Sequence, residues 1–198
     1  MLHLNQFFIK EHVGLFKLSN AYDIIDPQSG KKVGLAQEKP GGLILFLRLI
    51  INKQMLPTKV EIIENPDDKG IGKNIVTIKR GLTFIRSKVR VFIDGDKEIG
   101  YLKSKLFSLG GGFWIYDSFD KKLAEVKGDW KGWNFKLLDD SGKEIGTITK
   151  KWGGLGKEMF TSADNYMIAI SESASKDMGA KALLLAAGIA IDTVYKEK

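Results

Sequence analysis

The sequence predicts a mostly β fold, a closed antiparallel β-barrel of about 12 strands around a central hydrophobic C-terminal helix. Two observations lead to this prediction. Short apolar segments alternate with turn sequences along most of the chain, and the last long segment is apolar on every side. The composition agrees, because 22 glycines stand against only 4 prolines and glycine can supply the turns.

Most of the strands come from a repeated unit. Each unit has an apolar strand, a polar turn rich in Asp, Gly or Ser, and a second strand that carries Gly or Ala. The four units are residues 22–36, 91–102, 114–126 and 135–148. Further strands are expected at residues 59–64, 74–80 and 88–93. Regular short strands with such turns favour an antiparallel sandwich or a closed barrel.

The final element is expected to be a helix at about residues 176–195, because its apolar run between Lys181 and Asp192 is rich in Ala and Leu. A helix without a polar face must be surrounded on all sides, and a small barrel is one of the few structures that can do this. The residues expected to be buried there are Leu183, Leu184, Leu185, Ile189 and Ile191. Because no clear boundary interrupts the chain, residues 1–198 are interpreted as one domain.

A second apolar run, residues 43–51, is interrupted by Arg48. Its periodicity does not separate a short helix from a buried strand. A membrane-spanning helix needs about 20 apolar residues, and neither apolar run reaches that length. We therefore expect both runs to be buried core segments, with a membrane-inserted or interfacial segment as the alternative.

The composition argues against an enzyme. The chain has no cysteine and only two histidines, His3 and His12, which excludes thiol chemistry and makes a His-based triad or a multi-histidine metal site unexpected. The paired carboxylates that begin at Asp67 and Asp139 lie in turn-like sequence, where such side chains stabilise the turn. We therefore expect no catalytic residues.

The charge balance points to an anionic partner, since 31 basic residues against 24 acidic ones give a net charge of +7. Trp and Lys residues occur together in two stretches. This set comprises Lys127, Trp130, Lys131, Trp133, Lys150, Lys151, Trp152 and Lys157. Tryptophan suits a lipid interface, and each lysine attracts anionic head groups by about 1 kcal/mol. Alternatively, the tryptophans fill the barrel and the lysines cover its outside. Nucleic acid is not expected as the partner, because no recognition motif is present.

At three places the sequence resembles a known family. Residues 22–39 resemble the opening of the phospholipid scramblase domain, and residues 148–166, with Lys-Lys-Trp-Gly-Gly near the start, resemble its most recognisable motif. Residues 181–192 match its C-terminal helix in character and position. Residues 104–109 are also similar to LURP-one-related proteins. Both families belong to the tubby-like superfamily, so the resemblance implies a twelve-stranded barrel around a hydrophobic helix.

The resemblance also implies membrane phospholipids as targets and a calcium site just before the C-terminal helix. Asp164 and Asn165 match that site, while the later acidic stretch is reduced to Glu172 and Asp177. Calcium prefers six to eight oxygen ligands, several of them charged. We therefore expect no required cofactor, and Asp164 and Asn165 form only a weak calcium candidate.

Together these features predict a scramblase-like protein that binds anionic membrane phospholipids, with transbilayer lipid movement implied by the resemblance alone. The alternative is a soluble regulatory or scaffold barrel that binds a protein, nucleic acid or small ligand. With no recognisable signal peptide, we expect a cytoplasmic location or a peripheral one on the inner face of the membrane. The sequence leaves the oligomeric state open.

Overall fold

The computed structural model describes residues 1–12, 19–51, 55–82, 88–105, 112–129, 132–150, 165–174 and 176–195. These residues form twelve strands and two helices. In chain order they are β1 (Gln6–Glu11), β2 (Ala21–Ile25), β3 (Lys32–Glu38), α1 (Gly42–Leu47), β4 (Thr58–Glu64), β5 (Lys73–Arg80), β6 (Lys88–Ile93), β7 (Lys97–Ser104), β8 (Gly112–Asp117), β9 (Lys122–Asp129), β10 (Asn134–Leu138), β11 (Glu144–Thr149), β12 (Tyr166–Ile170) and α2 (Met178–Tyr195).

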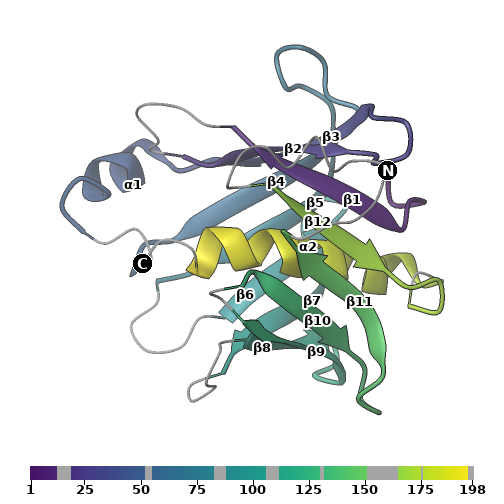
Figure 1. Ribbon diagram of the computed structural model, residues 1–198. Coiled ribbons are helices and arrows are strands. Elements are labelled where there is room, and N and C mark those ends of the chain that lie inside the picture. The colour runs from purple at the N-terminus through teal and green to yellow at the C-terminus, as the bar shows by residue number, and fades with distance from the viewer. Residues whose placement is uncertain are drawn as a thin grey trace.

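The strands close into one barrel in which each strand pairs antiparallel with its neighbours in sequence (Figure 1). The ring is completed by β1 and β12, where Phe8 lies opposite Met167. Closure pairs both edges of every strand that the structure describes. The predicted fold class is therefore confirmed, including the antiparallel order and the terminal helix.

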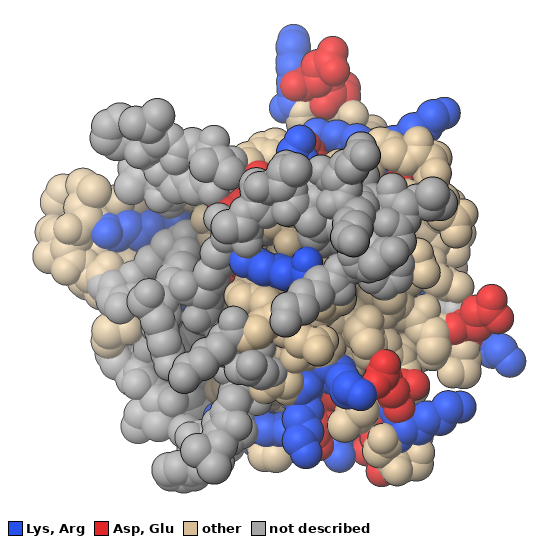
Figure 2. All heavy atoms as spheres, in the orientation of Figure 1, with Lys and Arg blue, Asp and Glu red and all other residues tan. Residues whose placement is uncertain are grey.

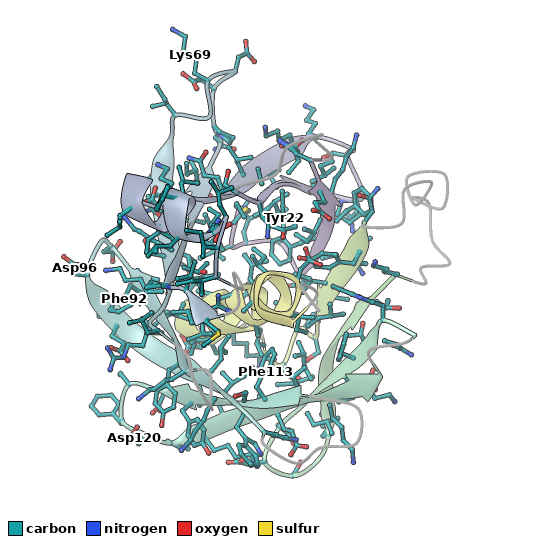
Figure 3. The ribbon with its side chains drawn as sticks, turned by 90° about the vertical axis from the view of Figure 1, so that its left-hand side faces the viewer. Tyr22, Lys69, Phe92, Asp96, Phe113 and Asp120 are labelled. Carbon is teal, nitrogen blue, oxygen red and sulfur yellow. The ribbon has the colours of Figure 1, made fainter. Side chains whose placement is uncertain are left out.

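Helix α2 runs through the barrel along its axis, and Figure 3 shows it end-on at the centre of the ring of strands. Its five expected core residues are all at most 3% exposed: Leu183, Leu184, Leu185, Ile189 and Ile191. Inward-facing strand residues such as Tyr22 and Phe113 pack between the strands and the helix. At Gly188, a Cβ atom would lie 2.3 Å from Ile168 Cδ1, so this glycine allows the helix to approach β12.

Short turns join the strands at one end of the barrel, which we call the hairpin end. In four of these turns an aspartate side chain accepts hydrogen bonds from backbone N–H groups: Asp26, Asp67, Asp117 and Asp139. The predicted turn-stabilising role of Asp67 and Asp139 is thus confirmed. The same end holds the start of α2, where Asp177 Oδ1 accepts a hydrogen bond of 2.8 Å from the Gly179 N–H.

The opposite end, which we call the α1 end, carries α1 between β3 and β4 (Figure 1). Here the prediction that residues 43–51 are buried is wrong. Leu43 is 72% exposed, Leu49 is 69% exposed and Ile50 is 73% exposed. The physical reason is that α2 and the inward-facing strand residues already fill the barrel, so a second apolar segment has no interior to enter. The run is a short helix followed by turns, which leaves the interfacial alternative.

Candidate functional site

The one charged residue of the exposed apolar run fixes it to the barrel. Arg48 extends back to Glu38 at the end of β3, and the two side chains are only 2% and 1% exposed. Arg48 Nη1 donates to Glu38 Oε2 at 3.1 Å, and Nη2 donates to Oε1. Glu38 Oε2 also accepts from the Asn20 N–H at 3.1 Å. This two-point buried pair holds the run in a defined place.

Around that buried pair, large apolar side chains face outward. We call this set the α1 apolar segment: Leu43, Phe46, Leu49, Ile50, Ile51 and Met55, which are 38–73% exposed. Single exposed apolar residues are common on proteins, but a gathered patch marks a surface for another protein or a membrane. Among the described residues, no helix has both the length and the hydropathy that crossing a bilayer requires.

The structure places three of the eight predicted Trp and Lys residues. Lys127 is exposed on β9 and lies opposite Lys136 of β10. Trp133 precedes β10, and its ring packs 5.9 Å from the Phe135 ring and 5.2 Å from the Tyr166 ring. Lys150 Nζ lies 4.5 Å from the Trp133 ring. The other five lie outside the described residues: Trp130, Lys131, Lys151, Trp152 and Lys157.

Trp133 and Lys150 therefore come together at the α1 end, but not as a freely projecting pair. Trp133 is partly buried and packs against the barrel core, which corresponds to the alternative interpretation of the tryptophans. Figure 2 shows basic and acidic side chains next to one another on this side of the barrel, and Lys136 of β10 pairs with Glu144 of β11 at 2.9 Å. This side of the barrel is of mixed charge.

The calcium candidate is only partly covered by the structure. Asn165 is 3% exposed at the start of β12, while Asp164 lies outside the described residues. Across the described ranges, no three His, Asp or Glu side chains are placed so that they could hold a metal ion. The calcium site remains a prediction.

A carboxylate lies inside the barrel near the end of α2. Asp192, which the sequence interpretation treats as the end of the apolar run, is 2% exposed. Burial and then the Asp192 carboxylate raise the pKa of the Tyr22 hydroxyl well above its ordinary value, and the same two causes act on the pKa of Tyr166. Both hydroxyls therefore stay protonated next to the buried Asp192 side chain.

The sequence interpretation missed the exposure of the α1 apolar segment. The available signal was Arg48, because a lone arginine within an apolar run needs a buried carboxylate or solvent. It also missed a group of cationic residues on the outer side of β5 and β6, namely Lys79, Lys88 and Arg90. Strand alternation alone could have placed Lys88 and Arg90 on one side of β6.

Comparisons with known proteins agree with this architecture. The family model described as "Scramblase" matches residues 5–198. A relative from Saccharomyces cerevisiae, "Altered inheritance rate of mitochondria protein 25", is 23% identical over 91% of this chain. The match spans 65% of that relative's own length. No solved structure matches the chain with significance. From the extent of the family match and the barrel around a central helix, we conclude that the chain belongs to the scramblase family.

Proposed function

We propose that this protein binds anionic phospholipid membranes through the α1 end of its barrel. The observation that carries the proposal is the α1 apolar segment, which exposes leucine, isoleucine and phenylalanine side chains around a buried Arg48–Glu38 pair. The net charge of +7 supports an anionic rather than a neutral surface. Membership of the scramblase family supports phospholipids as the ligand class.

The energetics fit reversible binding at the membrane surface. Fully burying one Leu, Ile or Phe side chain contributes about 1.5–3 kcal/mol, and a cation near an anionic surface contributes about 1 kcal/mol. A few partly inserted side chains therefore provide useful affinity. Because Arg48 and Glu38 already fix the segment in place, little conformational freedom is lost on binding.

In this proposal α2 stays inside the barrel. Its core residues are at most 3% exposed, so moving the helix into a bilayer would leave a large apolar cavity behind. Transbilayer lipid movement, which the family name implies, would be non-covalent and would need a polar path or a thinned bilayer for the head group. Surface binding is its first step, and it is the step that the α1 end can carry out.

Co-flotation with liposomes tests the proposal. Phosphatidylcholine vesicles with and without phosphatidylserine are compared at low and physiological salt, with and without calcium. The wild type is expected to float with the anionic vesicles in a salt-sensitive manner. The double variant Leu49→Ser/Ile50→Ser is expected to bind at least about tenfold more weakly, because two apolar anchors are lost. Phe119→Ser is the matched control, since Phe119 is 90% exposed at the hairpin end.

Two outcomes would contradict the proposal. If no vesicle binds under any of these conditions, the α1 apolar segment is a surface for a soluble partner and the scaffold-barrel alternative takes over. If vesicles bind but Leu49→Ser/Ile50→Ser and Phe119→Ser behave alike, the α1 end is not the membrane-facing end. Flotation that depends on calcium would support Asp164 and Asn165 as a calcium site.

A further inference from the structure

A cavity lined by cationic side chains lies on the outer side of β5 and β6, at the α1 end. Its volume is about 390 Å³, in the size range of small-ligand sites. Lys79, Arg80, Lys88 and Arg90 line it, together with Leu82 and Phe92. Among the residues that the structure describes, this lining holds four cations and no carboxylate. Such a cavity is suited to an anion.

The strand register brings two of these cations together. Lys79 of β5 lies directly opposite Arg90 of β6, and Lys88 lies opposite Lys103 of β7. Like charges directly opposite each other in a sheet are destabilising. Lys127 and Lys136 are opposed in the same way on β9 and β10, but Lys79 and Arg90 also line the cavity and are joined there by Lys88. The arrangement therefore points to a ligand that supplies the missing negative charge.

The counter-charges within the protein are weak. Lys79 Nζ lies 3.3 Å from Asp96 Oδ1, but that carboxylate side chain is 95% exposed. Arg90 Nε is 3.9 Å from Glu98 Oε2, at the outer limit of an ion pair. Aromatic rings hold the two lysines in place, with Lys79 Nζ 4.4 Å from the Phe92 ring and Lys88 Nζ 3.7 Å from the Tyr101 ring. Cation–π contacts orient an ammonium group without neutralising it.

The cavity is joined to the chain that follows the α1 apolar segment. Arg80 is 4% exposed, and its guanidinium donates to the Leu56 carbonyl oxygen at 3.1 Å and to Thr58 Oγ1 at 3.0 Å. Figure 3 shows Phe92 on the outside of the barrel, on the same side as α1. An anion bound here would therefore lie beside the exposed apolar side chains.

We infer that this cavity is a binding site for a phosphate-bearing anion, with Lys79, Lys88 and Arg90 as its contacts. A phosphate offers several acceptor oxygens to two lysines and one arginine at once. The site is argued from its own residues, and only the identification of its ligand as a lipid head group rests on the proposed membrane function. A soluble phosphate ester is the other source of the same chemistry.

The test uses glycerol 3-phosphate as a soluble probe, titrated into the full chain and followed by NMR. Arg90→Ala is expected to weaken binding about fivefold, and Arg90→Glu more strongly, as for a lost and a reversed charge. Lys69→Glu is the matched control, because Lys69 is exposed at the tip of the hairpin between β4 and β5 (Figure 3). Both glutamate variants change the net charge equally. Equal binding by Arg90→Glu and the wild type, or equal loss in both glutamate variants, would overturn the site.

A loss of glycerol 3-phosphate binding in Arg90→Glu can be distinguished from a loss of folding. Arg90→Glu replaces a like-charge pair with Lys79 by an opposite-charge pair and loses the 3.9 Å contact with Glu98, so its melting temperature is expected to stay close to that of the wild type. Loss of binding in a variant of unchanged or higher stability then reports the site itself. A large drop in melting temperature would show that Lys79 and Arg90 are already compensated, and would contradict the inference.

A vesicle arm separates the two ligand sources. Vesicles with phosphatidic acid carry a phosphate monoester, whereas vesicles with phosphatidylserine of equal charge do not. Preference of the wild type for phosphatidic acid, lost in Arg90→Glu and kept in Lys69→Glu, supports a lipid head group. If the protein binds glycerol 3-phosphate but no vesicles, the phosphate site is supported and the membrane proposal fails. If the wild type and Arg90→Glu bind the vesicles equally well, the membrane proposal is supported and the proposed cavity is not the site that binds the lipid.

Discussion

The hairpin end and the α1 end of the barrel use their polar and apolar residues differently. At the hairpin end, aspartates accept hydrogen bonds from the turns in which they lie, as Asp117 does from the N–H groups of Phe119 and Lys121. At the α1 end, a buried ion pair supports a set of apolar side chains that face outward. Among the described residues, the aspartates of the first end bind the N–H groups of their own turns, and Phe119 is an isolated exposed ring, whereas the second end carries six exposed apolar side chains in one segment.

This difference is the reason why we propose the α1 end as the place where the barrel meets other molecules. Local consistency between residue type and structure is the rule in folded proteins, and departures from it gather at functional sites. Exposed leucines, opposed cations at Lys79 and Arg90, and a buried arginine are departures of this kind, and all belong to the α1 end. The hairpin end follows the rule in the four turns with an aspartate acceptor.

The largest expected effect comes from breaking the pair that fixes α1. Glu38→Ala leaves the Arg48 guanidinium buried without its carboxylate, which is expected to cost about 3–5 kcal/mol of unfolding free energy. Urea denaturation followed by circular dichroism measures this cost. Glu144→Ala is the control, because Glu144 and Lys136 form an exposed pair worth at most about 1 kcal/mol. Similar losses in the two variants would show that the Arg48–Glu38 pair is not an anchor.

A smaller effect is expected at the hairpin end. Asp117→Ala removes the acceptor for two backbone N–H groups between β8 and β9, and is expected to cost about 1–2 kcal/mol. Asp117→Asn keeps an acceptor oxygen and is expected to retain most of that stability. If Asp117→Asn were as damaging as Asp117→Ala, the charge rather than the turn hydrogen bonds would stabilise this end. Melting temperatures of the wild type, Asp117→Ala and Asp117→Asn distinguish these two explanations.

The pH dependence of stability provides a further test at the hairpin end, with a smaller expected effect. The Ser141 hydroxyl and the backbone N–H groups of Ser141 and Lys143 lower the pKa of Asp139 in the turn between β10 and β11. Because the folded-state pKa lies below the unfolded one, the carboxylate contributes stability above about pH 4, and this is lost as pH falls through the folded pKa. Asp139→Asn is therefore expected to flatten the acid side of the stability profile. An unchanged slope in that variant would contradict the assignment.

The fold could be predicted from sequence because its signals are local and repeated. Alternation, turn residues and one all-apolar segment were enough to place the barrel and α2, and the buried state of Leu185 followed from the absence of a polar face. The turn roles of Asp67 and Asp139 were likewise readable, since an aspartate acts on N–H groups only a few residues away.

The candidate site could not be predicted in the same way, because it depends on which segments the interior leaves out. Apolar content alone cannot tell that α2 fills the barrel and that Leu49 therefore stays outside. The opposition of Lys79 and Arg90 is a property of the register between two strands, which one strand's sequence does not contain. Trp133 is partly buried against the core beside Tyr166, and its role at a lipid surface stays a prediction.

The smallest expected effect, on stability at Leu49, tests the difference between the two ends of the barrel most directly. Leu49 is 69% exposed, so Leu49→Ser is expected to change the unfolding free energy by at most about 0.5 kcal/mol, as for a surface position. A loss above about 1 kcal/mol in urea denaturation would mean that Leu49 packs against the barrel and that the α1 end also satisfies its own groups. If Leu49→Ser leaves the unfolding free energy unchanged but weakens flotation with vesicles, stability and membrane binding depend on different contacts. The leucine would then contribute to a surface outside the fold, which is the property that distinguishes the α1 end from the hairpin end.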